Sequence, residues 1–182
     1  MDSSLPASAG FVITGVMAAG KSTVADLLAR RFDRGVHLRG DVFRKMIVTG
    51  RDPIPPSLGP EAVRQLELRS RLAAVTANEY WRAGFTVVLQ DIYVGQALND
   101  VVARLEISPL FAVVLAPRPD VVASRERLRG KRGYVGDWTV QSLCSEFESA
   151  TPRIGLWLDT SDMSPTETVD EILLRCSEGR VR

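Results

Sequence analysis

One stretch, Phe11 to Thr23, constrains the fold of this chain more than any other. Its sequence, FVITGVMAAGKST, passes from apolar, strand-forming residues through Gly15 and four further residues to Gly20, Lys21 and Ser22. This spacing fits the pattern G-x-x-x-x-G-K-[ST] of a phosphate-binding loop. The residues that follow repeat apolar side chains at helical spacing. A strand before the loop and a helix after it are the context that the motif requires.

The residue types in this loop match the chemistry of a polyphosphate site. Glycines let successive backbone N–H groups turn inward around an anion. Lys21 can reach the β and γ phosphates, and the Ser22 hydroxyl can bind Mg²⁺. The helix that begins near Lys21 directs its positive end at the same anion. We predict that the nucleotide is bound by Gly15, Val16, Met17, Ala18, Ala19, Gly20, Lys21, Ser22 and Thr23.

Length and composition favour one soluble domain. The chain has 182 residues and a formal net charge of +1, so no overall charge favours nucleic acid or a membrane as partner. Cys144 and Cys176 lack the spacing of a zinc site or a disulfide framework. The first ten residues lack the pattern of a signal peptide, and no window resembles a membrane span. We expect a cytoplasmic protein, and the oligomeric state stays open.

Strand patterns alternate with helix patterns along the whole chain. Apolar runs predict strands at 11–13, 35–41, 85–92, 110–115 and 154–159. Helical periodicity or helix signals predict helices at 22–32, 42–50, 61–82, 98–105, 120–129, 138–149 and 164–176. Such alternation is typical of a parallel sheet with helices on both faces. The predicted fold class is therefore α/β, a three-layer α/β/α domain over residues 1–182 with a central five-stranded parallel sheet.

Two aspartates lie at the carboxyl ends of predicted strands. Because ligands bind at the carboxyl ends of parallel strands, Asp41 and Asp91 are expected on the same edge as the loop. Asp41 is interpreted as a general base or an anchor for an acceptor hydroxyl, with a helix N-cap as the structural alternative. Asp91 ends a hydrophobic strand, as in a Walker B site, where a carboxylate holds Mg²⁺. Metal contact, substrate contact and a turn role all remain open for Asp91.

A second informative stretch is basic. Arg125, Arg127, Arg129, Lys131 and Arg132 crowd together at the end of a predicted helix. Such a cluster suits a lid, here residues 125–137, that stabilises charge on a transferred phosphoryl group. The alternative is a basic helix end that interacts with the helix dipole. We predict Arg125 as a nucleotide contact and Arg129 and Arg132 as catalytic lid residues, together with Lys21 and Asp41.

These motifs together resemble a known family. The loop GVMAAGKST, the pair Gly40-Asp41 followed by Arg44, the strand ending in Gln90-Asp91 and the arginine-rich stretch before Tyr134 resemble the small P-loop kinases. The resemblance is strongest to the chloramphenicol-phosphotransferase-like group, which is related to the zeta toxins. It implies ATP with Mg²⁺ as cofactors and O-phosphorylation of a small hydroxylated compound. Asp41 matches the family's hydroxyl-activating aspartate, and the lid arginines match its phosphate clamp.

The resemblance leaves the acceptor open. Some members of the group modify antibiotics, and zeta toxins phosphorylate a sugar nucleotide, so an antibiotic, a housekeeping metabolite, a nucleoside or a sugar nucleotide all fit. The proline-dense region makes 42–60 a candidate substrate cap. Candidate acceptor contacts, with core packing as the alternative for the apolar ones, are Asp41, Phe43, Arg44, Met46, Ile47, Asp91 and Tyr93. A nucleotide-dependent switch acting on a protein is the rival from another class, and nucleic-acid phosphorylation is a third.

Overall fold

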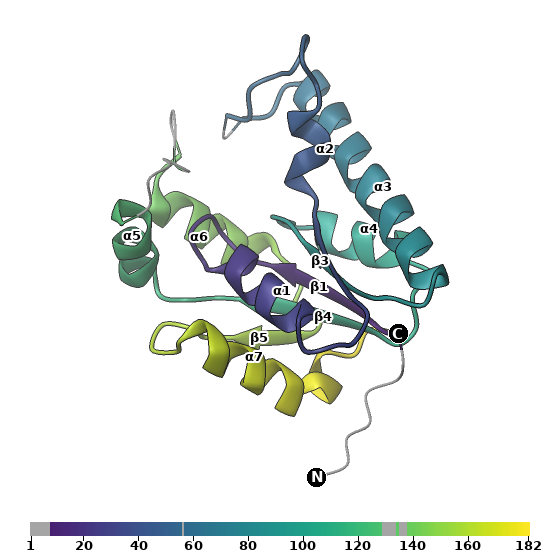
Figure 1. Cartoon of the computed structure of the whole chain (residues 1–182). Coiled ribbons are helices and arrows are strands. Elements are labelled where there is room, and N and C mark those ends of the chain that lie inside the picture. Colours follow the sequence, from purple (N-terminus) through teal and green to yellow (C-terminus); the bar gives the residue numbers. More distant parts are fainter. Residues whose placement is uncertain (1–7, 56, 129–133, 135–137) are drawn as a thin grey trace.

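The chain is built on one parallel sheet (Figure 1). A computed structural model describes residues 8–55, 57–128, 134 and 138–182. Its strands are β1 (Gly10–Thr14), β2 (Gly35–Arg39), β3 (Thr86–Gln90), β4 (Leu110–Leu115) and β5 (Leu156–Leu158). They lie in the order β2-β3-β1-β4-β5, and every neighbouring pair is parallel. The predicted five-stranded parallel sheet is confirmed.

Helices flank this sheet on both faces. They are α1 (Lys21–Ala29), α2 (Asp41–Lys45), α3 (Pro60–Arg82), α4 (Ala97–Arg104), α5 (Pro119–Arg127), α6 (Val140–Ala150) and α7 (Pro165–Leu174), followed by the short 3-10 helix η1 (Cys176–Gly179). Helix α1 packs against α7, whereas α3 packs against α4 (Figure 1). Strand β3 contacts both α1 and α3. The central strands are therefore covered from two sides, as the three-layer prediction requires.

Burial on both faces explains the composition of the central strands. All residues of β1, β3 and β4 are buried, and most of them are apolar. In the sheet, Phe11 pairs with Val88 on one side and with Phe111 on the other. The Phe11 and Phe111 rings stack with their centroids 5.0 Å apart. Continuous apolar runs, rather than alternating ones, are what a strand buried on both faces requires.

The long helix α3 buries a different face from the one its large side chains suggest. Val63, Leu68, Leu72, Val75 and Tyr80 are exposed. The buried positions carry mainly small or amide side chains, namely Ala62, Gln65, Ala73, Ala74, Ala77 and Asn78. Small residues let the helix backbone approach its neighbours closely, so size rather than hydropathy decides which face packs. No helix in the described part of the chain combines the length and apolar character that a membrane span needs.

The region after β2 differs from the prediction in its helix. The helix expected over 42–50 is only α2, which starts at Asp41 and ends at Lys45. Met46 is 69% exposed and Val48 is 93% exposed, so no apolar face extends the helix. The chain then runs to α3 without regular structure among its described residues. Asp41 thus stands in the first turn of a short helix at the carboxyl end of β2.

This topology brings the predicted site residues to one edge. The phosphate-binding loop follows β1, which lies between β3 and β4. Gln90 ends β3, and Asp41 follows β2 after a single intervening residue, Gly40. Ligands of open α/β sheets bind at this carboxyl edge, near the position where the strand order reverses.

Candidate active site

The phosphate-binding loop has a backbone that favours glycine at defined positions. Gly15 has φ of +143°, and a Cβ atom there would lie 2.4 Å from the carbonyl oxygen of Leu115. Gly20 has φ of +96°, and Ala18 is a non-glycine residue in the left-handed region with φ of +64°. This backbone wraps around a concave space rather than continuing into a hairpin. The two glycines of the motif are thus explained by conformation.

The start of α1 lacks a side-chain cap. Gly20 occupies the N-cap position and offers no side chain to the amides of the first turn. Helices α2, α3, α4 and α5 also lack a side-chain cap, whereas α6 and α7 begin with capping boxes, so it is the adjoining loop that sets α1 apart. A helix start with positive partial charge and no side-chain acceptor is a general feature of anion sites. The loop and α1 therefore fit the polyphosphate of a nucleotide.

Polar contacts hold the loop in shape. Lys21 Nζ donates to the carbonyl oxygen of Val16 at 2.7 Å, although Lys21 is only 8% exposed. The Tyr134 hydroxyl donates to the carbonyl oxygen of Met17 at 2.9 Å. Arg125 donates to the carbonyl oxygen of Thr160 at 2.8 Å, and it lies 3.5 Å from that of Ala19. The predicted nucleotide contact Arg125 thus lies beside the loop.

Ser22 makes its hydrogen bond to a residue that sequence reasoning missed. Its Oγ donates to Gln90 Oε1 at 2.8 Å. Gln90 is the last residue of β3 and is 5% exposed, so this bond links α1 to the strand that was expected to supply a metal ligand. Successive side chains of a strand point to opposite faces, so Gln90 and Asp91 cannot both face Ser22. The alternation alone does not say which of the two faces Ser22, so the sequence carried no signal that selects Gln90.

Asp91 is engaged elsewhere. Its carboxylate forms a double ion pair with Arg69 of α3, in which Arg69 Nε donates to Oδ2 at 2.6 Å and Arg69 NH2 pairs with Oδ1. Oδ1 also accepts the backbone N–H of Ile92 at 2.8 Å. Asp91 is 2% exposed. Because both oxygens already have partners, this arrangement does not support the prediction that Asp91 binds Mg²⁺ together with Ser22.

Gly40 belongs to the same arrangement. A Cβ atom at this position would lie 2.2 Å from Asp91 Oδ2. The turn between β2 and α2 therefore packs directly on the Asp91 carboxylate, and Asp41 is the next residue along the chain. Burial lowers the pKa of the Arg69 guanidinium, and the side chain is only 13% exposed. In sequence, the signal for Arg69 was an arginine at helical spacing from the small buried residues Ala62 and Ala73.

Asp41 is flanked by cations. Arg39 NH2 donates to Asp41 Oδ2 at 3.3 Å, and Lys45 Nζ, one helical turn further along α2, pairs with the same oxygen. Partial burial favours the protonated acid, but Lys45 and Arg39 outweigh it and lower the pKa of Asp41. The other oxygen, Oδ1, is buried without a hydrogen-bond partner. At neutral pH Asp41 is therefore a carboxylate with one unpaired oxygen, as a hydroxyl-binding base requires.

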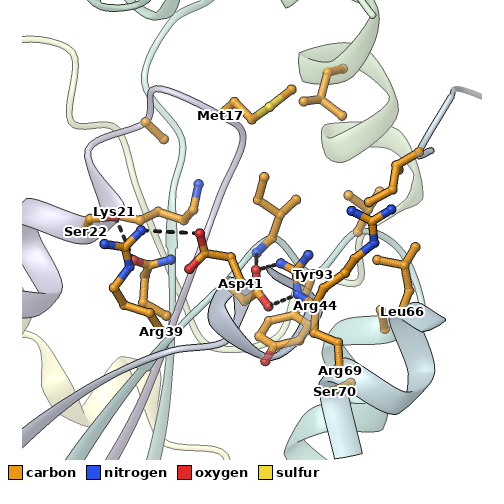
Figure 2. A pocket seen from close by; sticks show the side chains of 18 of the residues that line it. Met17, Lys21, Ser22, Arg39, Asp41, Arg44, Leu66, Arg69, Ser70 and Tyr93 are labelled. Carbon is orange, nitrogen blue, oxygen red and sulfur yellow. Dashed lines mark hydrogen bonds and ion pairs between the residues drawn. The ribbon is translucent and has the colours of Figure 1, made fainter. Parts of the chain in front are cut away.

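One cleft of about 1560 Å³ collects these residues. Its lining includes the loop from Met17 to Thr23, whereas the predicted nucleotide contacts Gly15 and Val16 are not among the lining residues. Figure 2 shows Asp41 between Lys21 and Ser22 on one side and Arg44 and Arg69 on the other. After the roles predicted from the sequence, the side near Lys21 and Ser22 is called the donor side, and the side near Arg44 and Arg69 the acceptor side. The predicted contacts Arg44, Asp91 and Tyr93 all line the acceptor side.

Other predicted acceptor contacts do not reach the cleft. Phe43 and Ile47 are not part of its lining, and neither is Met46. Phe43 packs against the hydrophobic core, and Met46 is exposed. In a helix, residues 43 and 44 point about 100° apart, so Phe43 turns away when Arg44 faces the cleft. For Phe43 the core alternative is the one that the structure supports.

The structure describes only part of the predicted cap, residues 42–60, and of the predicted lid, residues 125–137. Arg51, Asp52, Pro53, Ile54 and Leu58 of the expected cap 42–60 line the cleft. Trp138 Nε1 donates to the carbonyl oxygen of Ile54 at 3.0 Å, which links this segment to the start of α6. Arg129 and Arg132 lie outside the described residues, so their catalytic role stays a prediction.

A magnesium site can be assessed from the donor atoms present. The described residues contain no group of three or more acidic, histidine or cysteine side chains able to hold a metal ion. Mg²⁺ commonly uses few protein ligands and takes the rest from water and substrate phosphates. The Ser22 hydroxyl beside the uncapped start of α1 fits that mode, with Gln90 fixing its orientation.

Comparison with known proteins shows the family and the fold of the chain. The family model of the AAA domain AAA_33 matches residues 11–148. No curated protein sequence matches the chain. Three similar solved structures are an unliganded sugar kinase from Janibacter sp. HTCC2649, the APS kinase CysC of Mycobacterium tuberculosis in complex with AMPPNP and APS, and the tunicamycin resistance protein of Deinococcus radiodurans.

The similarity extends over the full length of these proteins. The sugar kinase has a TM-score of 0.71 at 19% identity, covering 94% of this chain and 95% of that one. The APS kinase has a TM-score of 0.67 at 20% identity, covering 93% of this chain and 97% of that one. The tunicamycin resistance protein has a TM-score of 0.64 at 15% identity, covering 96% of this chain and 99% of that one. At such identities the likeness shows the fold alone, and the chloramphenicol-phosphotransferase-like subtype stays a prediction. The match over residues 11–148 shows that the chain belongs to the AAA_33 family of AAA domains, with a kinase-like P-loop NTPase fold.

Proposed function

We propose that this chain is an ATP-dependent phosphotransferase that phosphorylates a hydroxyl group of a small molecule. The observation that carries the proposal is the position of Asp41. Its carboxylate lines the same cleft as Lys21 and Ser22, although it comes from a different strand end. A nucleotide-hydrolysing switch needs the loop, but it does not need a carboxylate opposite the γ-phosphate in a cleft with room for a second molecule.

The donor side would hold the nucleotide. The loop amides and Lys21 bind the phosphates, and Mg²⁺ would be held by the Ser22 hydroxyl and the phosphate oxygens. When bound, Mg²⁺ supplies positive charge to the phosphate oxygens. Gln90 keeps the Ser22 hydroxyl oriented. Lys21 offsets negative charge that increases as the bond to the leaving phosphate breaks.

Asp41 would prepare the acceptor. The acceptor oxygen forms a bond to the γ-phosphorus while the bond between that phosphorus and the β,γ-bridging oxygen breaks, so ADP leaves with the electron pair. The hydroxyl proton passes to the Asp41 carboxylate. Lys45 and Arg39 keep Asp41 ionised before transfer. Charge balance is maintained, because the phosphoryl group transferred to the acceptor carries its own negative charge with it.

The likeness to other kinases supports a small acceptor without identifying it. Similar folds occur in proteins described as a sugar kinase, an APS kinase and a tunicamycin resistance protein. These kinds of protein fit either a metabolite or an antibiotic as the acceptor. Transfer to a hydroxyl, ATP as donor and Mg²⁺ as cofactor remain parts of this proposal.

The test is ADP release from ATP and Mg²⁺ against hydroxylated antibiotics, nucleosides, sugars and sugar nucleotides. Wild-type protein is compared with Asp41→Asn, which keeps the shape of the side chain but removes its charge. We expect one class of compound to stimulate ADP release and to yield a product heavier by one phosphoryl group in the mass spectrum. Slow hydrolysis that is indifferent to every acceptor and to Asp41 would favour the switch instead.

A further inference from the structure

Not every guanidinium group on the acceptor side of the cleft is paired with a carboxylate. Arg44 of α2, Arg51 of the segment after it and Arg69 of α3 all line the cleft, and the charge of Arg51 acts on Arg44. Figure 2 shows Arg44 and Arg69 beyond Asp41 as seen from Lys21. Arg69 is engaged by Asp91. The charge of Arg69 is therefore already matched within the protein.

Arg44 differs from Arg69 in this respect. Its Nε–H group is buried and has no hydrogen-bond partner, and Arg44 forms no ion pair among the described residues. Burial and the nearby charge of Arg51 lower its pKa, whereas Asp52 acts in the opposite direction. Asp52 is thus close enough to act on Arg44 electrostatically, but the two form no ion pair. Glu67 also lines the cleft without an ion pair among the described residues.

This arrangement is unfavourable without a ligand. A buried N–H group of a charged side chain that lacks a partner costs free energy, and a second cation nearby adds repulsion. A guanidinium group presents several donors in one plane, which match the oxygens of a carboxylate or a phosphate. An oxyanion at Arg44 would satisfy the unpaired donor and offset the repulsion from Arg51.

The geometry of α2 links this position to the transfer site. Arg44 follows Asp41 by three residues in the same helix. Residues so spaced share one face, with Cβ atoms roughly 5–6 Å apart. A small molecule that presents a hydroxyl to Asp41 can therefore reach Arg44 with another of its groups.

We propose that the acceptor carries an oxyanion, a carboxylate or a phosphate, and that Arg44 binds this group with the help of Arg51. That the bound anion is the phosphoryl acceptor rests on the proposed phosphotransferase function. The anion site itself does not, because it can be detected without turnover. The class of acceptor then becomes an anionic hydroxy compound rather than a neutral one.

The first experiment measures binding of inorganic phosphate at constant ionic strength. The protein is saturated with AMPPNP and Mg²⁺, so that the phosphate-binding loop is occupied, and phosphate is titrated by calorimetry. We expect one phosphate to bind to wild type and at least tenfold weaker binding to Arg44→Gln. Arg71→Gln is the matched control, since Arg71 is an exposed arginine of α3 outside the cleft lining. AMPPNP affinity reports whether each variant is folded.

Absence of saturable phosphate binding to the AMPPNP complex would overturn the proposal, and so would equal binding by wild type and Arg44→Gln. If AMPPNP itself does not bind, the proposed function fails. Phosphate binding is then compared between Lys21→Met and Arg44→Gln without nucleotide. Loss in Arg44→Gln with retention in Lys21→Met would still support the anion site, and the reverse would count against it.

The second experiment separates the two oxyanions. ADP release is measured with glucose, gluconate and glucose 6-phosphate as matched neutral, carboxylate and phosphate probes, each titrated from below to above its KM. A lower KM for one anionic probe than for glucose, lost in Arg44→Gln with kcat changed less, is the expected result and names the oxyanion. A preference for the neutral probe that Arg44→Gln leaves unchanged would overturn the proposal while leaving the phosphotransferase function intact.

Discussion

The donor side and the acceptor side of the cleft are built in different ways. The donor side is almost entirely one continuous segment, in which the loop and the first turn of α1 supply backbone, Lys21 and Ser22. The acceptor side is assembled from the turn after β2, from α2, from α3 and from the end of β3. Its shape depends on the buried pair of Arg69 and Asp91. The donor side is thus a local structure, whereas the acceptor side is a product of tertiary packing.

The difference predicts how each side responds to mutation. Changes on the donor side should remove nucleotide chemistry and leave folding intact. Changes to the ion pair of Arg69 and Asp91 on the acceptor side should affect stability first. The following variants test that contrast, in order of decreasing effect.

Within this series, Lys21→Met should cause the largest loss of turnover. We expect kcat to fall by about 10²- to 10³-fold, as when one preorganised group that stabilises transition-state charge is removed. The measurement is ADP release under saturating ATP, with AMPPNP affinity in parallel. Arg71→Gln is the control and should retain wild-type turnover. Near-wild-type activity of Lys21→Met would mean that the donor side does not lie at this loop.

Asp91→Asn should destabilise the fold. It leaves the buried Arg69 guanidinium without its charged partner, which typically costs about 3–5 kcal/mol in the free energy of unfolding. The measurement is urea unfolding. Asp170→Asn, which breaks the exposed pair with Arg31, is the control and should cost much less.

The same variant tests the metal prediction for Asp91. If the pair with Arg69 is its role, the Mg²⁺ concentration that gives half-maximal activity should not change in the folded fraction of Asp91→Asn. A double variant, Asp91→Leu with Arg69→Met, should recover part of the lost stability, because it removes both buried charges. A raised Mg²⁺ requirement with unchanged stability would restore Asp91 as a metal ligand.

Gln90→Leu should have a moderate effect. It releases the Ser22 hydroxyl from its hydrogen bond while conserving volume at a buried position. We expect the Mg²⁺ concentration for half-maximal activity to rise about tenfold, as for loss of a group that orients a metal ligand. Ser22→Ala serves as the comparison and should raise it at least as much. An unchanged requirement in both variants would remove Ser22 from the metal site.

Lys45→Met should give the smallest effect, a displacement of the pH profile. Lys45 and Arg39 lower the pKa of Asp41, so the ionised base persists as the pH falls until that lowered pKa is passed. Removing Lys45 raises the pKa toward its ordinary value. The acidic limb of kcat/KM should therefore move to higher pH, whereas Lys45→Arg should keep the wild-type limb. A limb that does not move in Lys45→Met would mean that another group titrates there.

The contrast between the two sides also explains what the sequence could predict. The loop was predictable because its phosphate contacts are encoded within thirteen consecutive residues, Phe11 to Thr23. The sheet was predictable because strands buried on both faces need continuous apolar runs. Asp41 could be placed on the functional edge, since parallel strands end on the same side.

Other features depended on contacts that no local pattern encodes. Asp91 resembles a Walker B residue in sequence, but Arg69, 22 residues earlier, takes its carboxylate. Most large apolar residues of α3 are exposed, because packing selects the face with small residues. Phe43 and Arg44 are adjacent in sequence, and only the orientation of α2 decides that Arg44 lines the cleft.

The measurement that tests the central claim most directly compares AMPPNP binding with acceptor-dependent ADP release in Lys21→Met and Asp41→Asn. If one cleft joins a local donor side to a separate acceptor side, Lys21→Met loses both AMPPNP binding and acceptor-dependent ADP release. Asp41→Asn then keeps wild-type AMPPNP affinity and loses about 10²- to 10⁴-fold in transfer, the usual contribution of a general base. Asp41→Asn protein that transfers phosphate at the wild-type rate would contradict the account.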